Sequence, residues 1–327
     1  MRTYVPATSY LATQAATLSA GQCRLLSTGL LGSTLIFSSE GANMIQWGGS
    51  MYHDTLRNEI GYIGKRDSSS YPYHWLVYDI ATNAWSNSRA VWSTANVSGH
   101  GYDHNAFDPD TGRVYHREYG ADYLHYWDGS TWSTTAAWSG TETIVGGLCH
   151  FPGVGMVTND GSMLRKYAGG AWSNLFTMPA PADSYHDIIE YNASANVVVF
   201  GGGNSSDYRK MTSGEVISTI ATPPYTLGTS ASGPQAFLVS APGSDQYLAW
   251  DYGTLGWRQY DVSADAWTTL TQSSGDGSSP QTGLPNLASG TASSVVHVAL
   301  ETLGVVLFVQ YRGSGSTPAD VWIYKHA

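Results

Sequence analysis

Short apolar runs alternate with turn-forming residues along the whole chain. Runs of valine, isoleucine, tyrosine and tryptophan are broken repeatedly by glycine, asparagine, aspartate or serine, and no long stretch carries the apolar spacing of an amphipathic helix. This pattern predicts many brief β-strands joined by tight turns. We therefore predict an all-β protein.

One phrase recurs in the sequence: a tyrosine, a turn and a tryptophan. It begins as VYDIATNAWSNS at Val77 and QYDVSADAWTTL at Gln259, and returns in shorter form as YWDGSTWSTT and RKYAGGAWSNL. A degenerate copy, RKMTSGEVIST, places Met211 and Val216 in the two aromatic positions. The Asp-Gly, Gly-Gly and Ser-Gly turn centres of the short copies suit tight hairpins because glycine tolerates positive φ. Each copy predicts a hairpin whose second strand opens with a large apolar anchor.

A second hairpin precedes each of these units. Six segments hold two apolar strands around a turn: TLIFSSEGANMIQWGG (34–49), NAFDPDTGRVYHR, LCHFPGVGMVTND, IIEYNASANVVVFGGG, FLVSAPGSDQYLAW and VALETLGVVLFVQ. Four strands per unit, recurring about every 45 residues, predict a β-propeller. We predict six four-stranded antiparallel blades in a single domain spanning residues 1–327. The tryptophan recurs because each outer strand is expected to pack against the neighbouring blade.

The two ends of the chain predict how the ring closes. The sixth inner hairpin is followed by DVWIYKHA, which supplies a third strand but no fourth. The segment RTYVP resembles the missing strand, so we predict that Arg2–Pro6 pairs beside Trp322–His326 and removes the exposed sheet edges. The long first unit, between Tyr4 and Trp85, leaves a seven-bladed ring as the alternative, with the extra blade around GQCRLLSTG.

Two glycine pairs carry a family resemblance. Gly48-Gly49 in MIQWGGS and Gly201-Gly202 in VVVFGGGN are each followed by a tyrosine-to-tryptophan hairpin or its equivalent. These features resemble kelch repeats, and the blade layout of nearly the whole chain is similar to the central domain of galactose oxidase. The copper-site motifs of that enzyme are not matched. Kelch propellers bind proteins, bind glycans or carry catalysis, so the resemblance implies a fold and leaves the activity open.

The composition and charge of the chain limit the classes of partner that it can bind. The chain has a net charge of −10, and only 12% of its residues are charged. Without a basic patch we predict neither a nucleic-acid partner nor membrane association, and no segment is apolar enough for insertion. The first residues lack the apolar core of a signal peptide. The lysine-poor composition, rich in Ser, Thr, Gly and aromatics, resembles bacteriophage particle proteins, which favours an extracellular or virion-surface location. Cys23 and Cys149 can form one disulfide or none.

Connection lengths predict the functional face. In a propeller the turns within hairpins emerge on one face, and the connections from second to third strand and between blades emerge on the other. The latter are longer here, and long loops on a rigid scaffold are where function usually lies. The longest is expected to run from Ser50 to Tyr73. We predict that this long-loop face binds a ligand through His53, Arg57, His100, Tyr102, Asp103, His116, Arg117, Tyr119, Tyr185, His186, Asp187, Tyr252 and Arg312.

Three functions fit such a face. Aromatic rings stack on the apolar side of a sugar while Asp, Arg and His pair its hydroxyls, so a non-enzymatic recognition module for a glycan or protein surface comes first. The second is a polysaccharide lyase or hydrolase: propeller lyases use His and Tyr as base and acid with Arg neutralising a uronate, which makes His104, His186, Tyr119 and Arg117 the candidates. The third is a structural assembly module, forming a homo-oligomer or docking onto a particle.

Metal and cofactor binding are not predicted. Four histidines, His104, His150, His186 and His297, lie at or near inner strands, but no close-spaced ligand pair joins them. The segment Asp108-Pro-Asp-Thr-Gly112 has the residues of a hairpin turn and lacks the later carboxylates of a calcium loop. Glycosylation triplets begin at Asn96, Asn192 and Asn204.

Overall fold

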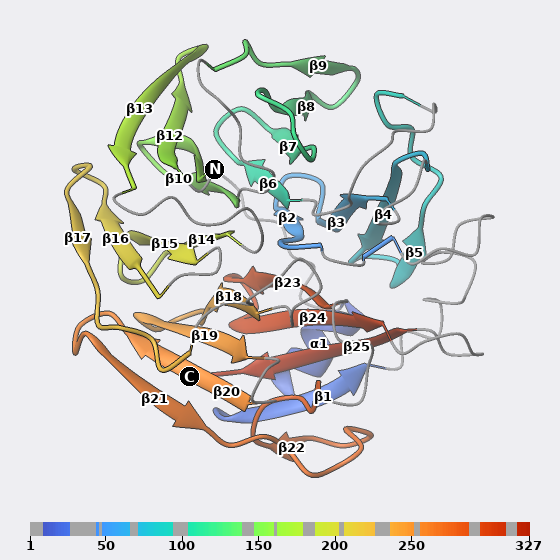
Figure 1. The fold of residues 1–327 in the computed structure, drawn as a ribbon. Helices are drawn as coiled ribbons and strands as arrows, with labels where there is room; N and C mark the ends of the chain where they lie inside the picture. Colours follow the sequence, from blue (N-terminus) through green and yellow to red (C-terminus); the bar gives the residue numbers. More distant parts are fainter. Residues whose placement is uncertain are drawn as a thin grey trace.

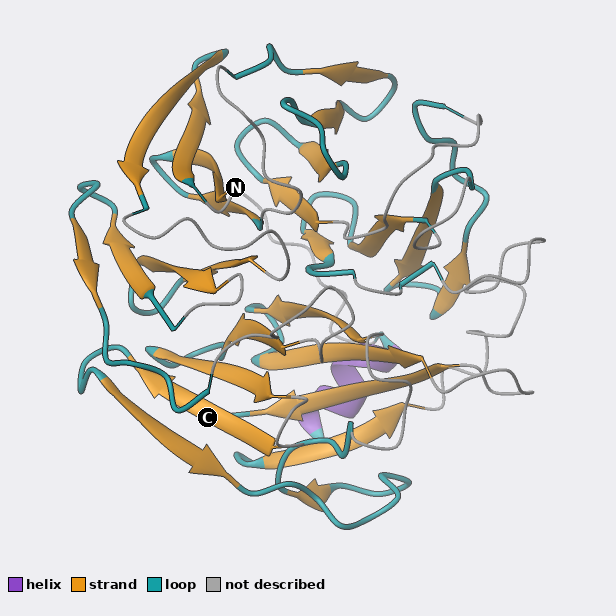
Figure 2. Cartoon of the chain, in the orientation of Figure 1, coloured by secondary structure: helices purple, strands orange, loops and turns teal. Residues whose placement is uncertain are grey.

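Six antiparallel sheets are arranged in a ring around a central channel, as Figure 1 shows for this computed structural model. The structure describes residues 9–26, 44–45, 48–65, 71–93, 104–138, 147–159, 162–178, 187–202, 206–225, 236–251, 256–287, 295–311 and 319–327. Within them strands dominate and one helix occurs, α1 (Tyr10–Ala16) (Figure 2). The prediction of an all-β, six-bladed propeller is confirmed.

The blades follow one another along the chain. The first three comprise β2 (Tyr52–Asp54), β3 (Glu59–Gly64), β4 (His74–Asp79) and β5 (Ala84–Ser86); β6 (His104–Asp108), β7 (Arg113–Arg117), β8 (His125–Trp127) and β9 (Trp132–Thr134); and β10 (Leu148–Phe151), β11 (Gly155–Asn159), β12 (Met163–Ala168) and β13 (Ala171–Thr177). The next two comprise β14 (Asp187–Asn192), β15 (Val197–Gly202), β16 (Tyr208–Thr212) and β17 (Ile217–Thr219); and β18 (Ala236–Ser240), β19 (Gln246–Asp251), β20 (Gly256–Asp261) and β21 (Ala266–Leu270).

The sixth blade joins the two ends of the described chain. Its order is β22 (Gln281–Thr282), β1 (Gln22–Leu26), β25 (Ala319–Lys325), β24 (Val305–Tyr311) and β23 (Val295–Leu300). In Figure 1 the blue strand β1 runs beside the red strand β25, in an antiparallel register from Gln22 opposite Lys325 to Leu26 opposite Val321. The predicted closure of the ring by an N-terminal strand is confirmed.

The identity of the closing strand differs from the prediction. Both edges of β25 are occupied, by β1 and by β24, so the pairing of Arg2–Pro6 beside Trp322–His326 is wrong; Arg2–Pro6 itself lies outside the described residues. The segment GQCRLLSTG, considered for a seventh blade, supplies the closing strand. This segment can form the closing strand because it buries a side chain on each face: Leu26 packs in the apolar cluster between the first and sixth blades, and Cys23 packs in the cluster between the fifth and sixth.

The inner hairpin of the first blade also lies elsewhere than predicted. It is formed by β2 and β3 within 52–64, inside the stretch from Ser50 to Tyr73 that we expected to be a loop, and not by 34–49. Of 34–49, only residues 44–45 and 48–49 are described, and they are not in strands. The prediction failed here because Asp54 is a polar residue at the end of a strand. Its buried carboxylate caps the turn by accepting hydrogen bonds from the backbone N–H groups of Leu56 and Arg57.

In three blades the recurring tryptophan links the outer strand to the preceding blade. The indole N–H donates to a backbone carbonyl in the connection that leaves the previous blade: Trp132 to Ala90 at 3.0 Å, Trp172 to Ala136 at 2.7 Å, and Trp267 to Ala221 at 2.8 Å. The Trp132 ring also lies edge-on to Trp75 of the first blade, with centroids 5.2 Å apart. Packing against the neighbouring blade, as predicted, is confirmed.

The degenerate copy of this phrase has a different anchor from the one predicted. In the fourth blade Met211 pairs with Ile217, whereas Val216 is 65% exposed. The turn between Met211 and its partner is one residue longer than the turn between Tyr167 and Trp172. The longer turn contains Glu215, whose backbone adopts the left-handed conformation with φ 60°.

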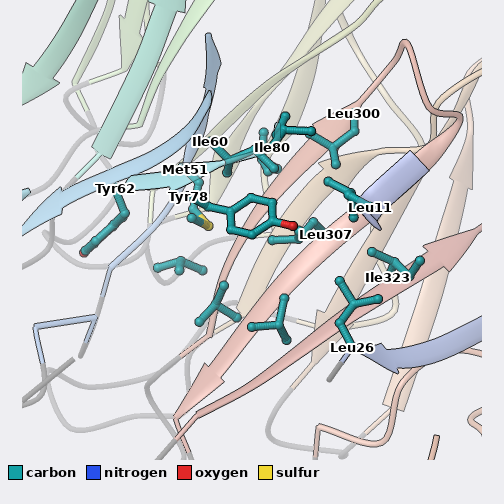
Figure 3. Packing of buried hydrophobic residues seen from close by; sticks show 14 of the residues in the cluster. Leu11, Leu26, Met51, Ile60, Tyr62, Tyr78, Ile80, Leu300, Leu307 and Ile323 are labelled. Atoms are coloured by element: carbon teal, nitrogen blue, oxygen red, sulfur yellow. The ribbon is translucent and has the colours of Figure 1, made fainter. Parts of the chain in front are cut away.

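Helix α1 seals the seam between the first and sixth blades. Ser9 caps the helix by accepting a hydrogen bond from the N–H of Ala12, and the spacing of Leu11 and Ala15 buries one helix face. Figure 3 shows Leu11 of α1 and Leu26 of β1 in the same apolar cluster as Ile60 and Tyr78 of the first blade and Leu307 and Ile323 of the sixth. The closing strand therefore contributes to hydrophobic packing as well as to the sheet.

Two substitutions within β1 test the closure. Leu26→Ala leaves a cavity at the seam, and we expect it to lower the free energy of unfolding by about 2–5 kcal/mol. Arg24→Ala, two residues away, removes a side chain whose guanidinium donates to Thr17 in an exposed contact; we expect a change below about 0.5 kcal/mol. Urea unfolding measures both, and equal effects would contradict the seam packing.

Candidate functional site

A cavity of about 260 Å³ lies in the central channel. Each of the six inner strands contributes to its lining: β2, β6, β10, β14, β18 and β23. Residues of the short turns that join inner hairpins also line it, including Thr55, Pro109, Pro152, Ala193 and Thr302. The cavity therefore reaches the face that carries these short turns, opposite to the long-loop face.

Two histidines from adjacent blades line this cavity as neutral rings. Burial lowers the pKa of His53 to about 4, against the opposing influence of Asp54, and lowers the pKa of His297 to about 3. Neither His53 Nε2 nor His297 Nδ1 has a hydrogen-bond partner among the described residues. A neutral imidazole offers one N–H donor and one lone pair, so each of these lining residues has one buried ring nitrogen whose hydrogen-bonding capacity is not used by a described group.

Glu190 places a carboxyl group inside the channel. Its pKa is raised to about 8, mainly by burial, and the carboxylate of Glu301 acts in the same direction. The backbone N–H of Ser240, on the neighbouring inner strand, donates to Oε1 at 3.3 Å and acts in the opposite direction. Glu301, in the turn after β23, has its pKa raised by burial as well. Glu190 is therefore largely protonated at neutral pH, although part of its surface faces the channel.

The thiol of Cys149 lies in the same lining. Burial first, and then the nearby Glu190 carboxylate, hold its pKa well above the ordinary value. A thiol that stays protonated is a poor nucleophile. Cys149 and Cys23 are both free and buried, so the two do not form a disulfide.

His150, a residue of the cavity lining, lies beside two aspartates of the β6–β7 hairpin. His150 Nε2 is 3.3 Å from Asp108 Oδ1 and 4.0 Å from Asp110 Oδ2, and the three residues can bring one ligand atom each within 4.8 Å of one another. The Asp108 carboxylate also accepts hydrogen bonds from the Asp110 and Thr111 N–H groups and from the Thr111 hydroxyl. The hairpin turn expected for this segment is confirmed. The group could hold a divalent ion, and the predicted absence of a metal stays a prediction.

The first two predicted site residues lie on the face opposite to the predicted one. His53 is on β2 and Arg57 is in the β2–β3 turn. The Arg57 guanidinium donates to the Asp54 carboxylate and, at 3.1 Å, to the carbonyl of Gly112 in the second blade. Of the two, His53 therefore reaches the cavity, while Arg57 links two blades.

Three predicted residues lie on or next to β7. His116 is buried, with Nδ1 3.1 Å from the Asn105 amide oxygen. Arg117 is 2% exposed; its guanidinium donates to Thr158 Oγ1 at 2.7 Å and to the Asn159 carbonyl in the third blade. Tyr119 follows the strand and is partly exposed. The placement of Arg117 gives it a role in joining blades.

The remaining predicted residues cannot be assembled into a site. His100, Tyr102, Asp103, Tyr185, His186, Tyr252 and Arg312 lie outside the described residues. Asp187 begins β14, and its side chain is not described. The lyase candidate His104 begins β6, where its ring fills the space beside Gly49 that a Cβ would need. Binding through the long-loop face stays a prediction.

Glu190, Ser240 and Glu301 are the cavity residues that sequence reasoning missed. A charged residue inside the apolar run IIEYN was the available signal, because an inner strand buried on both faces rarely carries an acid without a role.

One of the three glycosylation triplets lies in the described part of the chain. Its Asn192 is 1% exposed, and the side-chain amide donates to the carbonyls of Ser244 and Gln246, so it is not an accessible glycosylation site.

Comparisons with known proteins support the fold alone. No protein-family model matches the chain, and no curated protein has a matching sequence. Among solved structures, the chain resembles a catalytically inactive virginiamycin B lyase from Staphylococcus aureus solved with quinupristin, with a TM-score of 0.53 and 8% identity over 88% of this chain and 82% of that one. A nidogen/laminin complex gives a TM-score of 0.49 and 10% identity over 70% of this chain and 80% of that one.

The fold and the channel cavity define the class: the chain is a six-bladed β-propeller. Kelch membership is not established by these likenesses. The two glycine pairs of the kelch resemblance occupy different places in their blades, since Gly48-Gly49 precede the first strand and Gly201-Gly202 end the second. Within the described residues, the single helix has seven residues and is too short to cross a bilayer.

The raised pKa of Glu190 predicts a pH-dependent stability. Between the unfolded-state pKa near 4.5 and the folded-state value of about 8, the folded protein binds the proton more tightly than the unfolded chain, so stability falls as pH rises through this window. Glu190→Gln removes the titration. We expect its melting temperature to match the wild type near pH 4.5 and to exceed it by at least about 2 °C at pH 8.5.

The more exposed Glu301 provides the comparison. Glu301→Gln should give a smaller gain at pH 8.5, because its carboxylate is better hydrated in the folded protein. A Glu190→Gln variant with an unchanged pH profile would show that this carboxyl is ionised in the folded protein at neutral pH.

Proposed function

We propose that this protein is a non-enzymatic recognition module that holds one residue of a glycan in its channel cavity. The carrying observation is a cavity walled by all six inner strands, whose lining residues include His53 and His297, each with a buried ring nitrogen that has no described hydrogen-bond partner. A buried polar atom left unpaired costs about 1–3 kcal/mol, which a ligand with matching groups recovers. Because the walls are strands of a closed ring, little ordering is needed when a ligand binds.

The size of the cavity favours a single small ring. At about 260 Å³ it lies just below the usual range of ligand pockets, roughly 300–1,000 Å³, and equals the volume of about nine water molecules. Aromatic side chains of Tyr52, Phe107 and Tyr191 belong to the lining and offer apolar surface to a sugar ring. A flat protein partner would instead need about 800 Å² of surface.

The chemistry of the lining favours binding over turnover. General acid–base catalysis uses groups that titrate near the working pH. Glu190, with a pKa of about 8, is such a group, whereas His53, His297 and Cys149 titrate far from neutral pH and supply no matched partner for it. A uronate lyase also needs a cation near the substrate carboxylate. The guanidinium of Arg117, the candidate for that role, is bonded to Thr158 and Asn159.

The remaining features of the proposal come from the sequence. Composition supports a place on an extracellular or phage particle surface, and the repeated four-stranded blade layout supports a kelch-like propeller. Long-loop residues such as Tyr102 and Tyr252 would then contact further sugar residues or a protein at the other mouth of the ring. A homo-oligomer could form whether the ligand binds at the short-turn mouth or at the long-loop mouth of the ring.

A blocked cavity tests this function. Ala193 is an exposed residue of the β14–β15 turn that lines the cavity, so Ala193→Trp should fill the mouth without disturbing the core. We expect wild-type protein to bind members of a glycan array and Ala193→Trp to lose at least about tenfold in affinity. Ala264→Trp, in an exposed turn of the fifth blade outside the lining, is the matched control and should bind normally.

Two outcomes count against the proposal. Equal glycan binding by Ala193→Trp and Ala264→Trp would exclude the channel cavity as the site. Release of unsaturated products from acidic polysaccharides, followed by ultraviolet absorbance and lost in His104→Ala, would replace recognition by the lyase function.

A further inference from the structure

Two carboxyl groups belong to the described lining of the channel cavity, and its histidines are the only nitrogen bases among the described lining side chains. Glu190 and Glu301 belong to its lining, and none of the described lining residues is a lysine or an arginine. Resting on the proposed glycan-binding function, we propose that the sugar residue held in this cavity carries a free ammonium group, and that Glu190 is its counter-ion. An amino sugar, unacetylated at nitrogen, is the ligand class that this predicts.

Glu190 lacks the partners that a buried carboxyl normally has. Its described hydrogen-bond donors come from Ser240 alone, whereas a carboxylate has about four acceptor positions. Glu301 raises the pKa of Glu190 through its like charge, so it is not a counter-ion. Buried acidic groups are usually paired with a cation or a metal. Glu190 is largely protonated in the free protein, and a cationic ligand beside it would favour the ionised carboxylate, so Glu190 would release its proton when the ligand binds.

The histidines supply acceptors that suit the same group. An ammonium group has three donors and no acceptor, so it needs lone pairs from its surroundings. His297 is 4% exposed, its Nδ1 has no described partner, and its ring is neutral, as is that of His53. Rotation of an imidazole about its Cβ–Cγ bond exchanges ring nitrogen and carbon positions, so each ring has two orientations in which it can present its nitrogens.

The spacing of these groups favours an organic cation over a metal ion. Among the described residues, Asp108, Asp110 and His150 are the one set of three whose ligand atoms come within 4.8 Å of one another, and Glu190, His53 and His297 are not in it. Acceptors that are too far apart to share one ion can still contact different atoms of a sugar. An anionic ligand is disfavoured because no lining cation would receive it and the chain has a net charge of −10.

Three sugars with the same ring and different groups at one position separate the effect of the ligand's charge from the effect of its shape. Isothermal titration of the full-length protein with glucosamine, glucose and N-acetylglucosamine at pH 7 compares an ammonium, a hydroxyl and an uncharged amide at the same ring position. We expect glucosamine to bind at least about tenfold more tightly than the other two, since charge-assisted hydrogen bonds are roughly twice as strong as neutral ones. In Glu190→Gln this preference should fall below about threefold.

Each result has a defined meaning. Circular dichroism and melting of Glu190→Gln establish that it is folded, and Glu301→Gln should lose less of the preference than Glu190→Gln. Equal binding of glucosamine and glucose by the wild type would overturn the ammonium assignment and leave the glycan function standing. Loss of glucosamine binding in EDTA would also overturn it, by assigning the contact to a metal ion. No binding of any sugar, here or on the array, would overturn the glycan function and this assignment with it.

Discussion

The antiparallel pairing of β1 with β25 is the constraint on which the rest of this structure depends. An open stack of six sheets would leave two unpaired edges and would expose the apolar side chains that now lie between the first and sixth blades. Pairing Gln22–Leu26 with Ala319–Lys325 places the first blade directly after the closing strand in sequence and next to it in space. Helix α1 and Leu26 then fill the seam that remains.

Closure is also what creates the candidate site. The inner strands come from six distant parts of the sequence, and they enclose a cavity because each contacts its neighbours around the ring. Burial within that ring keeps His53 and His297 neutral and raises the pKa of Glu190. The chemistry of the cavity is thus a consequence of the ring: the same side chains on an open sheet would be hydrated and would titrate near their ordinary pKa values.

The fold could be predicted because its blades repeat along the sequence, whereas features that occur once, such as the closing strand and the first inner hairpin, were harder to predict. The tryptophan of each outer hairpin recurs because each blade must dock on the last, so Trp132, Trp172 and Trp267 were visible as one pattern. The closing strand has no second copy in the sequence: RTYVP and QCRLL both have the composition of short strands, and the pairing of QCRLL with β25 could not be predicted from that composition. In the first blade, turn-capping by Asp54 gave a strand end the appearance of a polar loop. Glu190 was overlooked because its apolar neighbours made the strand resemble plain core.

Hydrogen–deuterium exchange of the native protein, resolved to the peptide covering β1, tests ring closure most directly. Because β1 is bonded to β25, its amides should exchange as slowly as those of β24 and far more slowly than those of the exposed turn at 263–265. Exchange of the β1 peptide at the rate of that turn, with β24 still protected, would contradict the closure of the ring by this strand.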